Sequence, residues 1–346
     1  MGLAERPLAL TLGDPAGIGP DIALVAWMAR ARERVPPFVL IGDEAVLAAR
    51  AEALGLSVPI VVVDEAAAAT KLFAGALPVL KLPVGTRVVA GRPDRAAMPA
   101  IMRSIELGVS LVRQGKARAV VTNPVSKAML YGAGFAFPGH TEYLAALAGA
   151  DEGHVPHPVM MLASGAFRVV PVTIHIPLKE VADVLTEDLI LATIETTAKD
   201  LGRFFGLERS RLAVSGLNPH AGEDGTLGRE EIDIIAPAIA AARVKGLDVT
   251  GPYPADTLFH EAARQTYDAA VCMYHDQALV PFKTLAFEDG VNVTLGLPFI
   301  RTSPDHGTAF GIAGTGKASP RSLIEALRLA DAMSKTVGAR TAGVEA

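Results

Sequence analysis

Short apolar runs, many of them rich in β-branched residues, recur along the chain and alternate with longer stretches of helical spacing. The apolar runs occupy residues 8–12, 38–41, 59–63, 117–122, 169–174, 212–215, 269–273 and 291–295. Several are apolar at every position, which is typical of strands buried on both faces of a parallel sheet. Helical spacing covers residues 21–32, 101–114, 186–201, 229–245 and 319–333. This alternation predicts an α/β fold with parallel strands.

Cap residues mark the ends of two of these helices. Ser319 before Pro320 has the composition of an N-cap followed by proline at the first helical position. Thr186 precedes two acidic residues and is a second N-cap, while Gly202 after Leu201 predicts the end of that helix. We therefore expect both helices to begin at these caps and the earlier one to end at the glycine.

The length of 346 residues and the hydrophobic fraction of 50% allow one large or two medium domains with a sizeable core. The sequence contains no internal repeat, low-complexity tail or Ser/Gly linker that would mark a domain border. For a chain of this size we expect two lobes with a cleft between them.

Charge and cysteine content exclude several classes of protein. The 32 Lys and Arg against 37 Asp and Glu give a net charge of −5 with no block of like charges, so nucleic acid is not an expected partner. The single cysteine, Cys272, can form neither an intrachain disulfide nor a zinc ribbon, which fits a reducing cytosol. The sequence shows neither a signal-peptide pattern nor an apolar run of membrane-spanning length, so we expect a soluble cytoplasmic protein.

The residues directly after each apolar run are informative, because ligands of open α/β sheets bind beyond the carboxyl ends of the strands. Three of the eight histidines occupy such positions, at His175, His220 and His275, separated by 45 and then 55 residues. Imidazole is a common ligand of divalent transition metals, and strand ends can converge on one point. Each histidine alone also fits a partly buried side chain bonded to a loop. The three together, with Asp256 and Asp276 near them in sequence, favour a metal site.

Two glycine-rich loops also follow apolar runs. The turn at 13–19 opens a helix, where small residues either make a tight turn or let a ligand approach the backbone. The loop at 306–320 precedes the final helix and is either a loop with a cap or the second half of a binding site. Together the two loops suggest a nucleotide or another extended ligand.

Three further positions are compatible with an anionic ligand. Thr141, with His140 before it, precedes or opens a short helix and is either a plain N-cap or part of an anion site. Lys283 and Arg301 adjoin apolar or uncharged runs, so each needs a partner. That partner is either a phosphate or carboxylate ligand or one of the acidic residues of the chain.

Six motifs resemble the 4-hydroxythreonine-4-phosphate dehydrogenases of pyridoxal phosphate (vitamin B6) synthesis. They lie, in the order of that family, at residues 13–21, 137–142, 216–223, 251–257, 273–277 and 295–303. The resemblance covers nearly the whole chain, and only residues 44–99 carry nothing distinctive.

The resemblance implies the fold of isocitrate and isopropylmalate dehydrogenases, with two α/β/α lobes and an active-site cleft between them. Residues 1–130 and 285–346 would form the first lobe, with the cofactor loops and both termini. Residues 131–284 would form the second lobe, with the metal and substrate site and the dimer contacts. The resemblance further implies an obligate homodimer whose active site is shared between subunits.

The same resemblance implies roles for single residues. A divalent ion, zinc, magnesium or cobalt, would be bound by His175 and His220 of one subunit and by His275 of the other. The positions that match substrate-contacting residues of the family are His140, Thr141, Lys283, Asn292 and Arg301. The candidate catalytic residues are Asp256, Lys283 and Asp276, with proton transfer assigned to Asp256 or Lys283. The nicotinamide dinucleotide, NAD or NADP, would meet Gly13, Asp14, Gly17, His306, Gly307, Thr308, Gly314 and Lys317.

The implied reaction oxidises the C3 hydroxyl of 4-phosphooxy-L-threonine, and the 2-amino-3-oxo-4-phosphooxybutanoate formed loses CO2 to give 3-amino-2-oxopropyl phosphate. The metal would stabilise the developing alkoxide, and the cofactor would accept the hydride. Related dehydrogenases of 4-phospho-threonate, of erythronate or of aromatic dihydrodiols are the nearest alternatives. An enzyme like the phosphate acyltransferases is an alternative of another class, against which the three histidines argue.

Overall fold

The computed structural model describes residues 5–126, 129, 140–149, 157–165 and 167–344, without the side chains of 140–142 and 341–344. The chain divides into two compact units, Met1–His157 with Leu297–Ala346, and Pro158–Gly296. These borders lie further along the chain than the expected ones at 130 and 284, and the roles assigned to the two lobes stay predictions. Among the described residues, no helix combines the length and the apolar character needed to cross a membrane.

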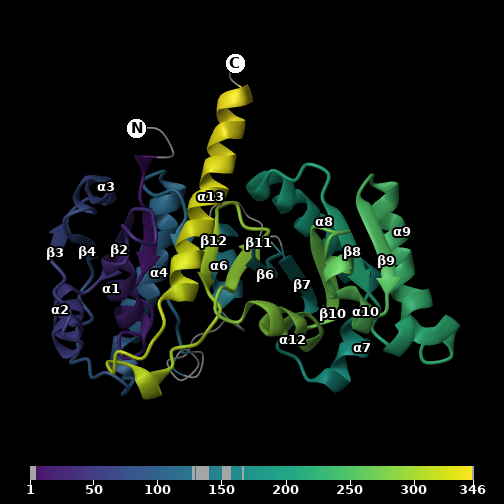
Figure 1. The fold of residues 1–346 in the computed structure, drawn as a ribbon, viewed down its shortest axis with the longest axis horizontal. Helices are drawn as coiled ribbons and strands as arrows, with labels where there is room; N and C mark the ends of the chain where they lie inside the picture. Colours follow the sequence, from purple (N-terminus) through teal and green to yellow (C-terminus); the bar gives the residue numbers. More distant parts are fainter. Residues whose placement is uncertain (1–4, 127–128, 130–139, 150–156, 166, 345–346) are drawn as a thin grey trace. The chain divides into compact units, whose positions relative to one another are not determined.

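The first unit is a parallel sheet with helices packed on it (Figure 1). Its strands follow the order β3-β4-β2-β1-β5-β12, and every neighbouring pair is parallel. The elements are β1 (Leu8–Thr11), α1 (Gly19–Met28), β2 (Phe38–Gly42), α2 (Glu44–Ala53), β3 (Ile60–Val63), η2 (Ala66–Ala68), α3 (Ala69–Leu72), β4 (Leu77–Lys81), η3 (Arg95–Ala97), α4 (Met98–Arg113), β5 (Val120–Val121), α6 (His140–Gly149), β12 (Arg301–Pro304), η7 (Phe310–Ile312) and α13 (Arg321–Val344). The expected parallel α/β arrangement is confirmed in this unit.

The second unit has strands in the order β11-β6-β7-β10-β8-β9. Its elements are β6 (Val159–Ser164), β7 (Phe167–Thr173), η4 (Leu178–Glu180), α7 (Val181–Val184), α8 (Glu187–Phe205), β8 (Arg211–Ser215), η5 (Pro219–Gly225), the π-helical turn η6 (Glu231–Ile235), α9 (Ala236–Val244), β9 (Asp248–Tyr253), α10 (Ala255–Leu258), α11 (Glu261–Arg264), β10 (Ala269–Tyr274), α12 (His275–Ala286) and β11 (Val291–Leu295). The strands β7, β10, β8 and β9 run parallel to one another.

The expected parallel direction does not hold at β6, which pairs antiparallel with both β7 and β11. Ser164 and Phe167 are directly opposite each other in this hairpin. So short a connection can join only antiparallel strands, whereas a parallel pair needs a crossover. The apolar pattern does not reveal this, because strands buried on both faces look alike in either direction.

Burial explains why the apolar runs form strands. Every residue of β1 and β2 is buried, so these strands are covered on both faces. In the second unit, α12 docks on β7 through Phe282, whose ring stacks on Phe167 with ring centres 5.6 Å apart. Burying one side chain of this size stabilises the fold by about 1.5–3 kcal/mol. The carboxyl ends of the parallel strands are thereby fixed relative to α12.

The predicted caps are partly confirmed. Thr186 accepts a hydrogen bond from the N–H of Leu189 at 3.2 Å, as an N-cap should. The expected end at Gly202 is wrong, because α8 continues to Phe205 and ends at Gly206, which has φ +72°. Two glycines lie four residues apart, and the left-handed cap forms at the second. The side-chain oxygen of Ser319 accepts from the N–H of Arg321 at 3.4 Å, so α13 begins close to its expected cap.

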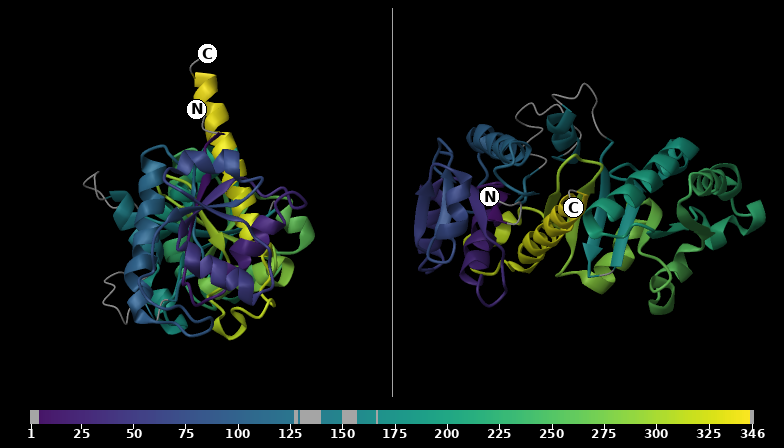
Figure 2. Two further views of the ribbon diagram at one scale, coloured as in Figure 1. Left: turned by 90° about the vertical axis from the view of Figure 1, so that its left-hand side faces the viewer. Right: turned by 90° about the horizontal axis from the view of Figure 1, so that it is seen from above.

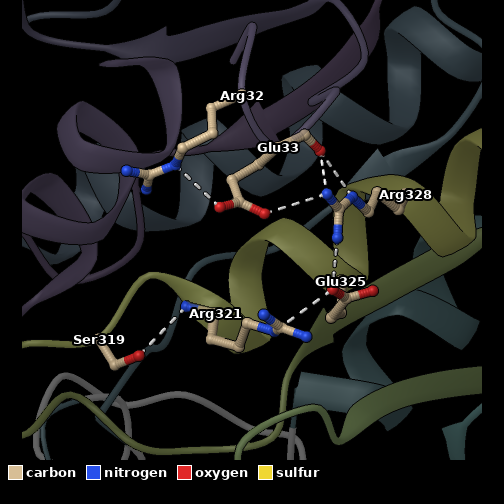
Figure 3. A network of polar contacts seen from close by, with 6 residues as sticks. All are labelled: Arg32, Glu33, Ser319, Arg321, Glu325 and Arg328. Carbon is tan, nitrogen blue, oxygen red and sulfur yellow. Dashed lines mark hydrogen bonds and ion pairs between the residues drawn. The ribbon is translucent and has the colours of Figure 1, made fainter. Parts of the chain in front are cut away.

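The final helix is tied to the segment after α1 by a network of charged side chains (Figure 3). Arg328 donates from Nε to the carbonyl of Glu33 at 2.8 Å and from Nη1 to the carboxylate of Glu325 at 2.7 Å. Arg321 pairs with Glu325 one turn earlier, at 3.5 Å. The C-terminal part of α13 extends past the sheet of its own unit in two of the views (Figures 1 and 2).

Candidate active site

The carboxyl ends of β7, β10 and β8 meet along one edge of the second unit, since these three strands are parallel neighbours. The segments that follow them carry His175, His275 and His220, respectively. This arrangement agrees with the expectation that separate βα connections supply residues to one site.

The rings of His175 and His275 lie side by side, with ring centres 5.5 Å apart and planes inclined by 44°. Both line a pocket of about 400 Å³ together with Thr173, Ile176, Leu178, Val181, Tyr274 and Asp276. His220 is not among the lining residues of this pocket. The fold therefore joins two histidines that are 100 residues apart in sequence.

The imidazole of His275 is held by the carboxylate of the next residue. Nδ1 of His275 lies 2.7 Å from Oδ1 of Asp276. A carboxylate in this position typically fixes the orientation and tautomer of a metal-binding histidine, and it directs the other ring nitrogen to the ligand. The contact gives a physical reason for an acidic residue next to His275.

Two of the three candidate ligands occupy strained backbone positions. His175 has φ +55° and His220 has φ +53°, in the left-handed region that L-residues rarely adopt. Such conformations persist only where the surroundings over-determine them, and they concentrate at functional sites. The loop of His220 packs against β9 and α10, and α10 carries Asp256 in its first turn.

A divalent ion is chemically compatible with the histidine pair. Two imidazoles bound to one tetrahedral ion at about 2.0–2.1 Å would have ring centres roughly 5 Å apart. Within one chain the spacing of His175 and His275 is close to this value, whereas the arrangement implied by the family resemblance takes His275 from the other subunit. No group of three His, Cys, Asp or Glu side chains is placed to hold a metal within the described part of this single chain.

Two proposed substrate residues of the second unit lie on α12 and β11. Lys283 is half-buried on α12, with its ammonium 5.5 Å from the ring centre of Phe287. Asn292 lies on β11, and its side-chain oxygen is buried without a hydrogen-bond partner among the described residues. A buried acceptor of this kind is costly unless a ligand or water satisfies it.

In the first unit the two glycine-rich loops contact each other directly. The N–H of Ile18 donates to the carbonyl of Thr308 at 3.0 Å. A Cβ on Gly17 would lie 2.9 Å from the same oxygen, so only glycine allows this approach. Gly13 has φ +69°, and a Cβ there would lie 2.6 Å from the Cβ of Asn123. These glycines are therefore required by loop packing, whether or not a ligand is present.

The other residues proposed to bind the cofactor differ in their contacts and exposure. The side chain of Asp14 accepts from the N–H of Ala16 at 3.0 Å, and burial raises the pKa of its carboxyl. Nδ1 of His306 lies 3.2 Å from the carbonyl oxygen of Gly307. A Cβ added to Gly307 would meet open space. Gly314 donates to Asp21 at 2.7 Å, and Lys317 is exposed.

Arg301 begins β12 and is 4% exposed. Its Nε and Nη2 donate to the hydroxyl of Thr122, at 3.2 and 2.7 Å, where β5 ends. Burial lowers the pKa of the guanidinium to about 10, so it stays protonated at neutral pH. A buried cation at a strand end is suited to hold a phosphate or carboxylate.

The helix α6 begins at His140, so Thr141 lies in its first turn, but the side chains of both residues lie outside the described part of the chain. The next turn is anchored by Tyr143, whose hydroxyl donates to Glu106 on α4 at 2.9 Å. Burial of the phenol, together with this contact, raises the pKa of Tyr143.

Sequence reasoning missed several residues that shape the site. Arg50 donates to the carbonyls of Gly17 and Pro15 in the first glycine-rich loop, at 2.9 and 3.0 Å. Gln277 bridges the ends of β8 and β10, and Glu231 accepts from the segment before His220. Only the Gln277 position belonged to a recognisable motif, and nothing in the local sequence distinguishes Arg50 or Glu231 from exposed helical residues.

Comparison with known proteins shows similarity along almost the whole chain. A family model described as pyridoxal phosphate biosynthetic protein PdxA matches residues 33–330. The 4-hydroxythreonine-4-phosphate dehydrogenase of Methylorubrum populi is 59% identical over 337 residues, which cover 97% of this chain and 96% of the relative.

Solved structures agree with this similarity. The 4-hydroxythreonine-4-phosphate dehydrogenase of Klebsiella pneumoniae superposes with a TM-score of 0.82 at 38% identity, covering 95% of this chain and 99% of the other. A terephthalate 1,2-cis-dihydrodiol dehydrogenase from Burkholderia xenovorans gives a TM-score of 0.62 at 28% identity, covering 94% and 98%.

Proposed function

Because the chain belongs to the PdxA family of pyridoxal phosphate biosynthetic proteins, we propose that it oxidises 4-phosphooxy-L-threonine with NAD+ or NADP+. The observation that carries this proposal is the 59% identity to a 4-hydroxythreonine-4-phosphate dehydrogenase over 97% of the chain. The product, 2-amino-3-oxo-4-phosphooxybutanoate, is a β-keto acid, so loss of CO2 to 3-amino-2-oxopropyl phosphate follows chemically. Formation of that product belongs to pyridoxine 5′-phosphate synthesis.

His175, His220 and His275 would hold one divalent ion, zinc, magnesium or cobalt. Bound there, the ion would supply Lewis acidity to the reacting hydroxyl. Asp276 holds the ring of His275 through Nδ1, which leaves Nε2 as the ligating nitrogen. Asn292 offers a buried oxygen to a donor on the substrate.

The charged residues would fix and deprotonate the substrate. The guanidinium of Arg301 binds the phosphate or carboxylate as a planar double donor, with Lys283 and the α6 start at His140 and Thr141 as further contacts. Asp256 and Lys283 are the two candidates for transfer of the hydroxyl proton. The pH dependence of kcat in Asp256→Asn and Lys283→Met decides between them, since only loss of the true base removes the corresponding limb of the profile.

The two glycine-rich loops would bind the nicotinamide dinucleotide. No atom lies close to the position that a Cβ of Gly307 would occupy, so a ligand can approach the backbone there. Lys317, in the same loop, is exposed and can pair with a phosphate of the ligand. Gly17 contacts both Asp14 and Thr308. Gly13 packs on Asn123, and Gly314 donates to Asp21, so these five residues fix the shape of the two loops. Bound there, the dinucleotide would supply the hydride acceptor, and the loops would orient it.

We further propose that the active protein is a homodimer in which His275 completes the metal site of the other subunit. Mixed dimers of His175→Ala and His275→Ala chains test this directly. If the ligands are shared, one of the two sites in a mixed dimer has all three histidines, and activity returns. If all ligands come from one chain, both sites stay incomplete and the mixed dimer is inactive.

The activity itself is tested by NAD(P)H absorbance with purified protein and 4-phosphooxy-L-threonine, with and without a chelator. Turnover that is lost with chelator and restored by a divalent ion supports the proposal. Parallel assays contain 4-phospho-threonate and an aromatic cis-dihydrodiol, because a dihydrodiol dehydrogenase shares the fold. Turnover of either compound, without turnover of the phosphorylated amino acid, contradicts the proposed substrate.

A further inference from the structure

The loop that carries His220 has an unusual backbone. Five successive residues have positive φ, with values of +53°, +51°, +81°, +45° and +51° from His220 to Asp224. Four of the five carry a side chain, and L-residues adopt this region as single residues rather than in runs. Local preference therefore does not maintain the conformation, and contacts from elsewhere must hold it.

Glu231, the first residue of η6, holds the segment directly before this run. Its side chain is buried, at 3% exposed, although it is a carboxylate. Oε1 accepts from the N–H groups of Leu217 and Asn218, both at 2.7 Å, and Oε2 accepts from Nδ2 of Asn218 at 3.0 Å. The burial of the charge is thus compensated by donors from the segment immediately before His220.

Three glycines allow the loop to wrap around this carboxylate. A Cβ on Gly216 would lie 2.9 Å from Oε1 of Glu231, and one on Gly222 would lie 2.6 Å from Oε2. A Cβ on Gly228 would lie 2.3 Å from Nδ2 of Asn218. Real side chains do not approach so closely, so Gly216 and Gly222 allow the contact with Glu231, and Gly228 allows the approach of Asn218.

The start of the loop is also tied to the helix that begins with His275. Nε2 of Gln277 donates to the carbonyl of Gly216 at 2.8 Å, and Gln277 lies in the first turn of α12. One end of the His220 loop is therefore fixed to the strand ends, while Glu231 fixes its next two residues.

We infer that Glu231 is a positioning residue for His220: its carboxylate holds the left-handed loop in the conformation that presents His220 to the divalent ion. This inference rests on the proposed metal site and adds a residue that touches neither metal nor substrate. A ligand held in place before binding loses less conformational freedom when the ion arrives, so its affinity is higher.

The test compares the wild type with Glu231→Gln and with the matched control Glu261→Gln. Both variants lose one negative charge from the second unit, but Glu261 is exposed on α11. The amide of Glu231→Gln has nearly the shape of the carboxylate, yet its NH2 group faces the NH2 group of Asn218 or the backbone donors. Gly222→Ala is a second variant, because its methyl group must displace the same carboxylate from the loop side.

Two measurements are made on intact protein: hydrogen exchange of the amides in residues 216–225 without metal, and Co2+ affinity from equilibrium dialysis and the visible spectrum. We expect faster exchange in Glu231→Gln and Gly222→Ala, together with at least a tenfold weaker Co2+ affinity. Glu261→Gln should match the wild type in both measurements. Thermal unfolding separates this local effect from loss of the fold.

Wild-type affinity in Glu231→Gln overturns the inference, as does weaker affinity with unchanged exchange at 216–225. If Glu231→Gln does not fold, an unchanged Co2+ affinity in Gly222→Ala also overturns the inference. A wild type that binds no divalent ion instead contradicts the proposed metal site, so failure of the two proposals is distinguishable.

Discussion

Asp21 and Arg50 form an ion pair in the interior of the first unit, where their side chains are 2% and 4% exposed. Arg50 also donates to two carbonyls of the first glycine-rich loop, and Asp21 accepts from Gly314 in the second. The pair therefore joins the two loops proposed to bind the dinucleotide. The pair also joins α1, which carries Asp21, to α2, which carries Arg50.

Removing one member of this pair should destabilise the protein strongly. For Asp21→Ala we expect a loss of about 3–5 kcal/mol in the free energy of unfolding, because Arg50 is left as an uncompensated buried charge. Urea denaturation measures the loss. Arg32→Ala is the control, since Arg32 is 81% exposed in its pair with Glu33 and should change stability by less than about 1 kcal/mol. Equal losses for the two substitutions would show that burial does not determine how much an ion pair contributes to the free energy of unfolding.

Replacing Arg301 by lysine should weaken substrate binding while a positive charge is retained. Lysine cannot act as a planar double donor, and a hydrogen bond to a charged group contributes about 1.5–3 kcal/mol. We therefore expect KM for the phosphorylated substrate to rise by roughly tenfold to a hundredfold, with KM for the dinucleotide unchanged. Steady-state kinetics measures both constants, and the exposed Arg229→Lys is the control. An unchanged substrate KM would remove Arg301 from the substrate site.

Asp200 should make stability depend on pH in a defined direction. Burial raises the pKa of its carboxyl above 3.8, although the N–H of Gly296 and the charges of Arg203 and Lys199 act in the opposite direction. The folded protein thus holds this proton more tightly than the unfolded chain. The stabilisation is complete below pH 3.8, the ordinary pKa of this carboxyl in the unfolded chain. It is lost as the pH rises through the raised pKa of the folded protein.

Asp200→Asn should therefore gain stability relative to the wild type as pH increases from acidic to neutral. Urea denaturation of both proteins at a series of pH values gives this difference directly. Asp183→Asn, at an exposed position on α7, is the control variant. A difference that stays constant or changes sign with pH would show that burial does not dominate the environment of Asp200.

Gln277 should be important for stability because all of its hydrogen-bonding groups are used inside the second unit. Its Oε1 accepts from Ser215 and from the N–H of Met273, both at 2.7 Å, and its Nε2 donates to Gly216. Gln277→Leu leaves these three partners unpaired, at a cost of about 1–3 kcal/mol for each buried group. We expect a clear fall in Tm for this variant. The exposed Gln265→Leu should leave Tm nearly unchanged, and a similar fall in both would contradict this explanation.

The sequence by itself determined the α/β class and the regions where polar residues gather. The apolar runs form strands, and the segments after β7 and β10 do bring His175 and His275 together. The strand prediction succeeds because hydrophobic periodicity is a local pattern. The strands β4, β6, β9 and β12 fell outside the predicted runs. The antiparallel direction of β6 depends on its neighbours rather than on its composition.

Only the tertiary structure decided which charged and polar residues became internal. Arg50 and Glu231 lie on helical segments, where such side chains are usually exposed. Arg50 contacts a loop 33 residues earlier, and Glu231 contacts backbone groups 13 and 14 residues earlier. Their burial is stable only because donors or acceptors from those segments meet them. Compensation of a buried charge depends on which segments come together in space, and no local pattern contains that information.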